Sequence, residues 1–224
     1  MRVLIATSNR GKLRDFAGAA VVYGITVEAL KDFANLPEAV EDGATFAENA
    51  RKKAEHYSRF AAGELVLADD SGLMVDALDG APGVRSARYA AGDTLSVDAS
   101  VDALSVDALS VAALSVDALN NAKLLRELEK IGEAEATARF VCVISAARDG
   151  CEVAQFRGEA AGIILREARG GMGFGYDPLF YAPSLGKSFA ELTPDEKAQV
   201  SHRGAALRKF LAWARREDRS AAPL

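Results

Sequence analysis

The sequence predicts an α/β fold with a mixed β-sheet. Short apolar, β-branched segments alternate with amphipathic segments of helical period, which is the pattern of strands connected by helices. Two long strand-like segments, at residues 136–150 and 152–164, instead follow each other across a turn at Asp149-Gly150, and this hairpin adds antiparallel pairing. At 224 residues the chain has the length of one large domain, and we expect residues 1–224 to form a single domain.

The chain opens with a strand, a polar turn and a helix. Residues 2–7 (RVLIAT) have the composition of a buried strand, residues 8–12 form a polar turn, and residues 13–24 have a helical pattern. This arrangement points backbone N–H groups at an anion, with the Lys12 ammonium beside them. The glycine spacing of a P-loop is missing. An ordinary helix N-terminus therefore explains this turn as well as an anion-binding site does.

A second strand leads into a pair of aspartates. Thr45 and Glu48 form a capping box, so we expect a helix from residue 46 to about residue 62. The apolar residues 64–68 predict a buried strand that ends at Asp69-Asp70-Ser71-Gly72. Because neighbouring strand residues face opposite ways, only one of the two aspartates would enter a given cleft, where a carboxylate suits Mg²⁺. A solvated turn built from Asp and Gly explains this segment equally well.

Residues 95–118 are a near-perfect five-residue repeat, LSVDA SVDA LSVDA LSVAA LSVDA. A period of five matches neither the helical period of 3.6 nor the strand period of 2. We therefore interpret the repeat as a low-complexity insert, either an irregular loop or a lengthened helix start, that is dispensable for activity. A normal amphipathic helix is expected directly after it, at residues 120–132.

The last third of the chain contains further candidate residues. Residues 170–177 place Phe174 and Tyr176 between glycines, which let a backbone approach a flat ligand while an aromatic face stacks on a nucleobase. Thr193 to Glu196 form a second capping box, and a helical stretch follows through residue 217. That stretch carries a cationic and hydrogen-bonding cluster of Lys197, Ser201, His202 and Arg203. Taken alone, residues 170–177 are more simply explained as a loop whose aromatic rings pack into the core. His202, taken alone, is more simply explained as a histidine with a structural role.

The composition excludes several classes of protein. The net charge is −5, and the acidic segment at residues 93–119 contains no Lys or Arg, so the rest of the chain is balanced and lacks the basic surface that binds duplex nucleic acid. No apolar run reaches the ~18 residues of a membrane span, and no signal segment precedes the first strand. Two cysteines, Cys142 and Cys151, are too few for a disulfide scaffold, so we expect a cytoplasmic protein.

Five segments, taken together and in order, resemble the inosine/xanthosine triphosphate pyrophosphatase family, enzymes that cleanse the nucleotide pool. They are ATSNRGK (6–12), TFAENA (45–50), ADDSGLMVDALDGAPGVRSARYA (68–90), GGMGFGYDPLF (170–180) and FAELTPDEKAQVSHRGAAL (189–207). Each segment alone is a weak signal, whereas five in the family's order are specific. The repeat departs from the family pattern, in which a short acidic stretch stands at that place.

The resemblance implies a fold, an activity and partners. The expected fold is an elongated mixed sheet flanked by helices, in two lobes with a nucleotide groove between them. The expected reaction is the Mg²⁺-dependent hydrolysis of ITP, dITP and XTP to the monophosphate and pyrophosphate, by a homodimer that binds neither nucleic acid nor a membrane.

The resemblance also assigns roles to individual residues. Asp70 would be the catalytic carboxylate and a metal ligand, with Glu41 or Glu38 as its acidic partner. The triphosphate would be held by Thr7, Ser8, Asn9, Arg10, Gly11 and Lys12. The base and the rest of the substrate would be contacted by Ser71, Phe174, Gly175, Tyr176, Asp177, Lys197, His202 and Arg203. His202 and Arg203 would read the 6-oxo edge of the purine, which adenine lacks.

Two alternative functions stay open at this point. The first is a pyrophosphatase for modified pyrimidine triphosphates. The base-reading residues argue for purines instead, but only through the family resemblance. The second is a nucleotide-binding module without catalysis, in which the repeat has disturbed the site or the dimer.

Overall fold

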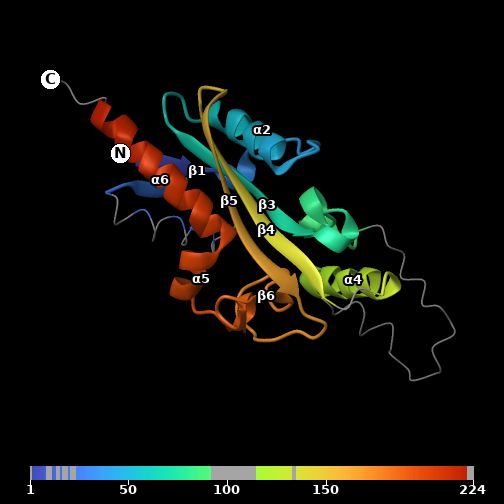
Figure 1. Ribbon diagram of the computed structural model, residues 1–224. Helices are drawn as coiled ribbons and strands as arrows, with labels where there is room; N and C mark the ends of the chain where they lie inside the picture. Colours follow the sequence, from blue (N-terminus) through green and yellow to red (C-terminus); the bar gives the residue numbers. More distant parts are fainter. Residues whose placement is uncertain are drawn as a thin grey trace. The chain divides into compact units, whose positions relative to one another are not determined.

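The computed structural model describes residues 2–8, 12–13, 16, 20, 24–91, 115–132 and 135–220. Within them the strands are β1 Arg2–Ile5, β2 Thr26–Ala29, β3 Val66–Val75, β4 Ala136–Arg148, β5 Cys151–Ile164, β6 Phe180–Ala182 and β7 Lys187–Ser188. The α-helices of the same part are α2 Phe46–Ser58, α4 Val116–Lys130, α5 Pro194–Val200 and α6 His202–Ser220 (Figure 1).

The strands form a mixed seven-stranded sheet in the order β2-β1-β3-β4-β5-β6-β7. β1 pairs in parallel with β2 and β3, whereas β6 is antiparallel to both β5 and β7. The predicted hairpin is confirmed: Asp149 and Gly150 join β4 to β5 with φ angles of 52° and 84°, the positive values that tight hairpin turns require. The predicted α/β class with a mixed sheet is therefore confirmed.

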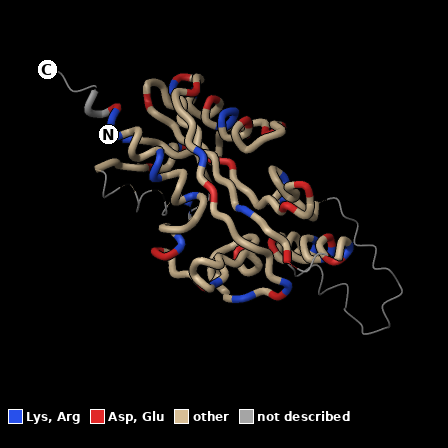
Figure 2. The backbone as a smooth tube through the Cα atoms, in the orientation of Figure 1, with Lys and Arg blue, Asp and Glu red and all other residues tan. Residues whose placement is uncertain are grey.

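Close packing divides the chain into two compact units. Unit 1 comprises residues 1–72, 139–161 and 192–224, and unit 2 comprises residues 73–138 and 162–191. Figure 2 shows Lys and Arg interspersed with Asp and Glu along the elements of both units. No helix among the described residues is long and apolar enough to cross a membrane.

In unit 1 a layer of strands has α2 against one face and α6 against the other (Figure 1). Alternate residues of β1 and β3 point to opposite faces of the sheet. One face packs against α6 in a core that includes Val3, Ile5, Leu67, Phe210 and Leu211. The other face packs against α2 in a core that includes Leu4, Val66, Ala68, Ala54 and Tyr57. This alternation decides the face on which each later residue of β3 emerges.

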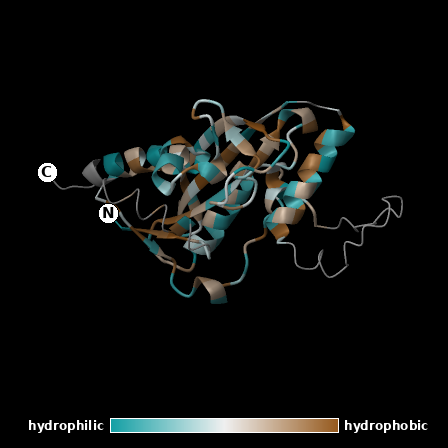
Figure 3. Ribbon diagram, turned by 90° about the horizontal axis from the view of Figure 1, so that it is seen from below, coloured by the Kyte–Doolittle hydropathy of each residue, from teal (hydrophilic) through white to brown (hydrophobic). Residues whose placement is uncertain are grey.

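Two helices of unit 1 follow from local sequence signals. Thr45 caps α2, because its hydroxyl accepts from the N–H of Glu48 while the Glu48 carboxylate accepts from the N–H of Thr45. Thr193 and Glu196 form the same capping box at the start of α5, as predicted. In α6 polar and apolar residues alternate along the helix, as its one buried face requires (Figure 3).

Unit 2 is organised around α4. The buried Asn120 side chain accepts from the N–H of Ala90 and donates to the carbonyls of Ser86 and Ala87. The hydroxyl of Tyr176 also donates to the Ser86 carbonyl, at 2.9 Å. These bonds tie α4 and the glycine-rich segment to the short helix Gly83–Arg88.

Three predicted elements differ in extent from the observed ones. α2 ends at Ser58 instead of about residue 62, because the N–H groups of Phe60 and Ala61 bond three residues back and tighten the chain into turns. The strand expected at residues 64–68 runs to Val75, so the two aspartates lie inside the strand and not at its end. The helical stretch after Thr193 is interrupted at Ser201, whose extended backbone separates α5 from α6.

One further difference concerns the first half of the chain. β2 was not predicted, because a four-residue strand at the sheet edge has too short a pattern to recognise. Most of the helix expected at residues 13–24 lies outside the described residues. Of this segment, Phe16 and Ala20 are fully buried in the core on the α6 face.

The last copy of the repeat forms the start of α4. Ser115 is the N-cap, and its hydroxyl accepts from the N–H of Ala118 at 3.2 Å. α4 therefore begins four residues before the predicted start at residue 120. The predictions for the earlier copies concern residues 95–114, which lie outside the described part of the chain.

Gly158 on β5 lets α6 lie directly on the sheet, and we expect Gly158→Ala to destabilise the protein. A Cβ at this position would lie 2.1 Å from the His202 carbonyl oxygen and 2.3 Å from the Ala206 nitrogen, both of them backbone atoms of α6. The expected loss is about 3 kcal/mol in the free energy of unfolding, measured by urea titration. Gly171→Ala is the control, since a Cβ at Gly171 meets nothing within 4 Å. Equal urea midpoints for the two variants would contradict this packing argument.

Candidate active site

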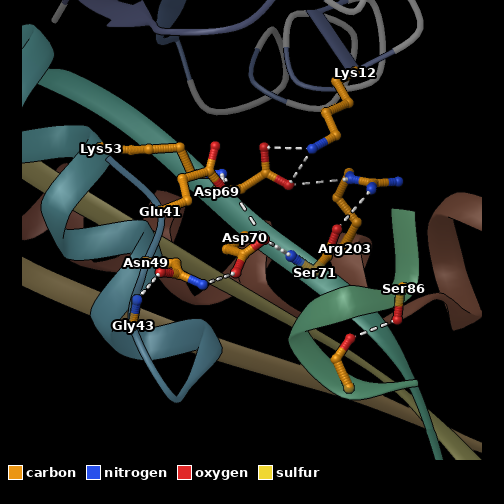
Figure 4. Close-up of polar contacts among 11 residues, drawn as sticks. Lys12, Glu41, Gly43, Asn49, Lys53, Asp69, Asp70, Ser71, Ser86 and Arg203 are labelled. Carbon is orange, nitrogen blue, oxygen red and sulfur yellow. Dashed lines mark hydrogen bonds and ion pairs between the residues drawn. The ribbon is translucent and has the colours of Figure 1, made fainter. Parts of the chain in front are cut away.

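The candidate site is built around two neighbouring aspartates of β3. Side chains two residues apart in a strand point to the same face of the sheet. Asp69 therefore shares the α6 face with Leu67, and Asp70 shares the α2 face with Val66 and Ala68. Each carboxylate therefore has its own set of partners (Figure 4). This confirms that the two aspartates face opposite ways.

Asp69 is the centre of a buried cluster on the α6 face. Its carboxylate accepts two hydrogen bonds from Lys12 Nζ, at 3.0 and 2.8 Å, and Arg203 Nε lies 3.9 Å away. Arg203 also donates to the Ser71 hydroxyl at 3.3 Å (Figure 4). Burial alone would raise the pKa of Asp69, but the charges of Lys12, Arg203 and Lys53 outweigh it and hold the pKa well below its ordinary value. Asp69 is therefore an ionised anchor for two cations.

Asp70 has a different environment on the α2 face. One oxygen accepts from Asn49 Nδ2 at 3.1 Å, and Lys53 Nζ lies 3.8 Å from the other. Burial raises the pKa of Asp70, and the charges of Glu41 and Asp69 add to this against the opposing effect of Lys53. A partly buried carboxylate with a raised pKa is suited to accept a proton.

α2, whose start is fixed by its capping box, supplies Asn49 and Lys53 as the partners of Asp70. Asn49 and Lys53 are one helical turn apart, so they lie on the same face of the helix. The buried Asn49 accepts from the N–H of Gly43 at 2.8 Å and donates to Asp70, which links the acidic loop to β3. A side chain at Gly43 would come within 2.7 Å of the Asn49 amide oxygen. The loop can therefore approach α2 closely only with a glycine here.

Glu41 joins Asp70 through a shared lysine. Lys53 Nζ lies 3.0 Å from the Glu41 carboxylate and 3.8 Å from that of Asp70. Burial alone would lower the pKa of Lys53, but the carboxylates of Asp70, Asp69 and Glu41 outweigh it and raise the pKa. Of the two acids that the sequence left open, Glu41 thus lies beside the lysine of Asp70, whereas Glu38 is exposed.

The donor set on this face fits Mg²⁺. Asp70 and Glu41 offer only oxygen atoms, and both already face one cation, the Lys53 ammonium. Protein sites for Mg²⁺ commonly use one or two carboxylates and complete the shell with water and substrate phosphates. Among the described residues no group of three His, Cys, Asp or Glu side chains is placed to hold a metal by itself, and a site of that kind does not need one.

His202 is the first residue of α6 and directly precedes Arg203 of the Asp69 cluster. The buried imidazole of His202 stacks on Phe140, with ring centroids 4.7 Å apart. Burial, followed by the charges of Arg203 and Lys197, holds the pKa of His202 well below its ordinary value, so the imidazole is neutral. Within the described part of the chain, its Nδ1 has no hydrogen-bond partner. A buried polar atom of this kind commonly marks a place for a ligand or a water molecule.

The glycine-rich segment of unit 2 exposes one aromatic ring and buries the other. Phe174 is 47% exposed, whereas Tyr176 is 4% exposed and donates to the Ser86 carbonyl. Asp177 is also buried, and its carboxylate accepts from the N–H of Phe174 at 2.8 Å. Tyr176 and Asp177 thus hold this loop in shape, and their predicted contacts with a base stay predictions.

The remaining candidate residues lie in the first turn of the chain. Thr7 is partly exposed and Ser8 is exposed, both directly after β1. Asn9, Arg10 and Gly11 lie outside the described residues, and their predicted contacts with a triphosphate stay predictions.

Three residues of this site were missed by sequence reasoning. Asp69, Asn49 and Lys53 had no predicted role, because a helical lysine usually faces solvent and because only one of the two aspartates was expected to enter a given cleft, a role that the resemblance gave to Asp70. The spacing of Asn49 and Lys53 was the available signal. They follow a capping box, lie one turn apart, and so have to share a face.

Comparisons with known proteins agree with the fold and with the motifs. The model of the Ham1 family matches residues 3–213. A dITP/XTP pyrophosphatase of Exiguobacterium sp. is 47% identical over 212 residues, covering 95% of this chain and 96% of the relative. A dITP/XTP pyrophosphatase of Geobacillus kaustophilus is 46% identical over 208 residues, covering 93% and 91%.

Solved structures lead to the same result. The structure of a Ham1 protein from Coxiella burnetii superposes with a TM-score of 0.78 at 35% identity, covering 96% of this chain and 98% of that chain. The Staphylococcus aureus Ham1 protein gives a TM-score of 0.76 at 35% identity, covering 97% and 100%. The resemblance drawn from the five sequence segments is thereby confirmed. This chain belongs to the Ham1 family.

Proposed function

We propose that this protein is a nucleoside-triphosphate pyrophosphatase that hydrolyses dITP, ITP and XTP to the monophosphate and pyrophosphate. The names of its relatives, dITP/XTP pyrophosphatase, support this substrate class. The observation that carries the proposal is the site on β3, where Lys12, Lys53 and Arg203 face three carboxylates. Cations of this density suit a polyanionic substrate, and a proton-accepting carboxylate beside them suits hydrolysis.

The reaction needs a nucleophile, a proton acceptor and charge neutralisation. A water oxygen attacks the α-phosphorus, the bond from that phosphorus to the bridging oxygen of the β-phosphate breaks, and pyrophosphate leaves with the bonding electrons. Asp70 orients the water and takes its proton. Lys12 and Arg203, both held by Asp69, are placed to balance the negative charge that grows on the departing group.

We assign Mg²⁺ as the metal, with Asp70 and Glu41 as its ligands. When bound, Mg²⁺ polarises phosphoryl oxygens and neutralises their charge. Lys53 holds the two carboxylates near one point, so that they are arranged before the metal binds. We do not include Glu38 in this ligand set, because it is exposed.

The other site residues are assigned to the substrate. Residues 7–12 hold the triphosphate after β1, and Ser71 contributes its hydroxyl beside Arg203. His202, neutral and buried with an unsatisfied Nδ1 among the described residues, donates to the 6-oxo group of the purine, and Lys197 and Arg203 lie beside it. Adenine presents an amino group at that position and leaves the donor unpaired, which is a strong basis for discrimination. Phe174 stacks on the base.

The proposal extends to assembly and compartment. The enzyme acts as a homodimer on small-molecule nucleotides, without nucleic acid or a membrane as a partner. We place it in the cytoplasm, where its cysteines stay reduced, since Cys142 and Cys151 are both free thiols.

Pyrophosphate release from a panel of nucleotides tests the proposal. With Mg²⁺, we expect turnover of ITP, dITP and XTP at least ~100-fold more efficient than turnover of ATP, since a missing hydrogen-bond partner costs that much or more. Preferential release from dTTP or UTP would replace the proposal with a pyrimidine-specific enzyme. Binding of ITP without pyrophosphate release would replace it with a non-catalytic nucleotide-binding module.

A further inference from the structure

Two side chains of α4 hold one glycine of the glycine-rich loop. The N–H of Gly175 donates to Asp117 Oδ2 at 2.7 Å, and the Gly175 carbonyl accepts from Asn121 Nδ2 at 3.0 Å. Asp117 and Asn121 are four residues apart and therefore lie on one face of α4. We call this pair the Gly175 clamp. Both backbone polar groups of Gly175 are thus fixed to a helix.

The clamp acts on the residue beside it. Phe174 precedes Gly175, and its own N–H donates to Asp177 Oδ2 at 2.8 Å. Its backbone is therefore held on both sides, while Phe174 as a whole stays 47% exposed. Gly175 has a φ of +63°, which a glycine adopts without strain. An exposed ring on a backbone fixed in this way is an aromatic platform formed before any ligand arrives.

We propose that Asp117 and Asn121 are positioning residues that fix Phe174 in the orientation that stacks on the substrate base. This inference rests on the proposed function, because it needs a base as the ligand of Phe174. Neither residue contacts the substrate, and both act through Gly175. A loop that is ordered in advance loses little conformational entropy on binding, so the clamp contributes to affinity for the base and not to the chemical step.

The clamp depends on the last copy of the repeat. Asp117 is the aspartate of the copy at residues 114–118, and Ser115 of the same copy caps α4. The preceding copy, at residues 109–113, has Ala112 where the last copy has Asp117. The identity of the copy that adjoins α4 therefore decides whether the Gly175 N–H has a carboxylate partner.

Steady-state kinetics of Asp117→Ala test the clamp. We expect the KM for ITP to rise about tenfold, the effect of losing one charge-assisted hydrogen bond, with kcat changed less than twofold. The Kd for IMP, which carries the base, should rise by a similar factor, and the Kd for pyrophosphate should not change. Asn121→Ala should raise the KM in the same way. Asp117→Asn keeps an oxygen acceptor for the Gly175 N–H and should restore a KM near that of the wild type.

Glu129→Ala is the matched control, because Glu129 is an exposed acid in the last turn of the same helix. It should leave the KM and the Kd for IMP unchanged. Thermal unfolding of each variant separates a local effect from loss of fold. If Asp117→Ala proves unfolded, Asn121→Ala and Asp117→Asn supply the same comparison.

Two deletions of equal length provide a second test. Removing residues 109–113 leaves an LSVDA copy directly before Leu119. Removing residues 114–118 instead puts the LSVAA copy at that place. The two products differ at one residue, Asp or Ala, at the position of Asp117. We expect the first deletion to keep the KM for ITP of the parent chain and the second to match Asp117→Ala.

Different outcomes contradict the two proposals. A wild-type protein that turns over ITP, together with an Asp117→Ala variant whose KM and Kd for IMP stay within twofold of it, overturns the clamp alone. An equal rise in the Kd for IMP and for pyrophosphate also overturns it, since that reports general damage. A wild-type protein that releases no pyrophosphate from ITP overturns the proposed function instead.

Discussion

Replacing Asp70 with asparagine should lower kcat for ITP by about 10³-fold and leave the protein as stable as the wild type. Asparagine has the same shape but cannot take a proton from the attacking water, a contribution of this size in general-base catalysis. Stability is maintained because burial disfavours the charge of Asp70, so that removing the charge costs the fold little. Pyrophosphate release and urea unfolding of the same preparation measure both quantities.

Asp79→Asn is the control for this substitution. Asp79 is exposed and has a φ of 51°, a conformation that asparagine also adopts readily. It should change neither kcat nor the urea midpoint. An Asp70→Asn variant that keeps more than a tenth of the wild-type kcat would remove Asp70 from its proposed role.

Replacing the neighbouring Asp69 with asparagine should have the opposite signature, a large loss of stability. Asp69 is 4% exposed and neutralises Lys12 and Arg203, of which Arg203 is buried as well. Removing one partner of a buried ion pair leaves uncompensated charge, which costs about 3 kcal/mol or more in the free energy of unfolding. Urea titration with an unchanged slope and a lower midpoint measures this loss.

A second variant shows whether the loss comes from unpaired charge. Adding Lys12→Met to Asp69→Asn removes one of the two orphaned cations, so the double variant should be more stable than the sum of the single losses predicts. Additive losses would mean that Lys12 and Asp69 do not interact energetically, in spite of their contact at 2.8 Å.

The sequence predicted those parts of the structure that depend on neighbouring residues. The two capping boxes, Thr45 with Glu48 and Thr193 with Glu196, are satisfied within one turn of helix, and both were located to the residue. The turn at Asp149 and Gly150 is equally local. In each case the partners of the backbone groups are specified a few positions away.

The parts that could not be predicted depend on distant partners. Asp69 is bonded to a lysine 57 residues earlier in the chain, and Ser71 to an arginine 132 residues later. These partners let β3 continue through polar residues that a local pattern assigns to a turn. Lys53 was missed for a related reason: only the tertiary structure distinguishes a lysine that faces an acidic site from one that faces water.

The repeat adjoining α4 has a consequence for how the gene can change. A unit of five codons keeps the reading frame whenever replication slippage adds or removes whole copies. Each such event places some copy next to Leu119, and four of the five copies carry an aspartate at the fourth position of LSVDA. The tract can therefore drift in length between lineages while the serine cap of α4 is regenerated each time, and its acidic side chain is regenerated whenever the copy left next to Leu119 is not LSVAA. Purifying selection on the tract should then concentrate on point substitutions in whichever copy stands last.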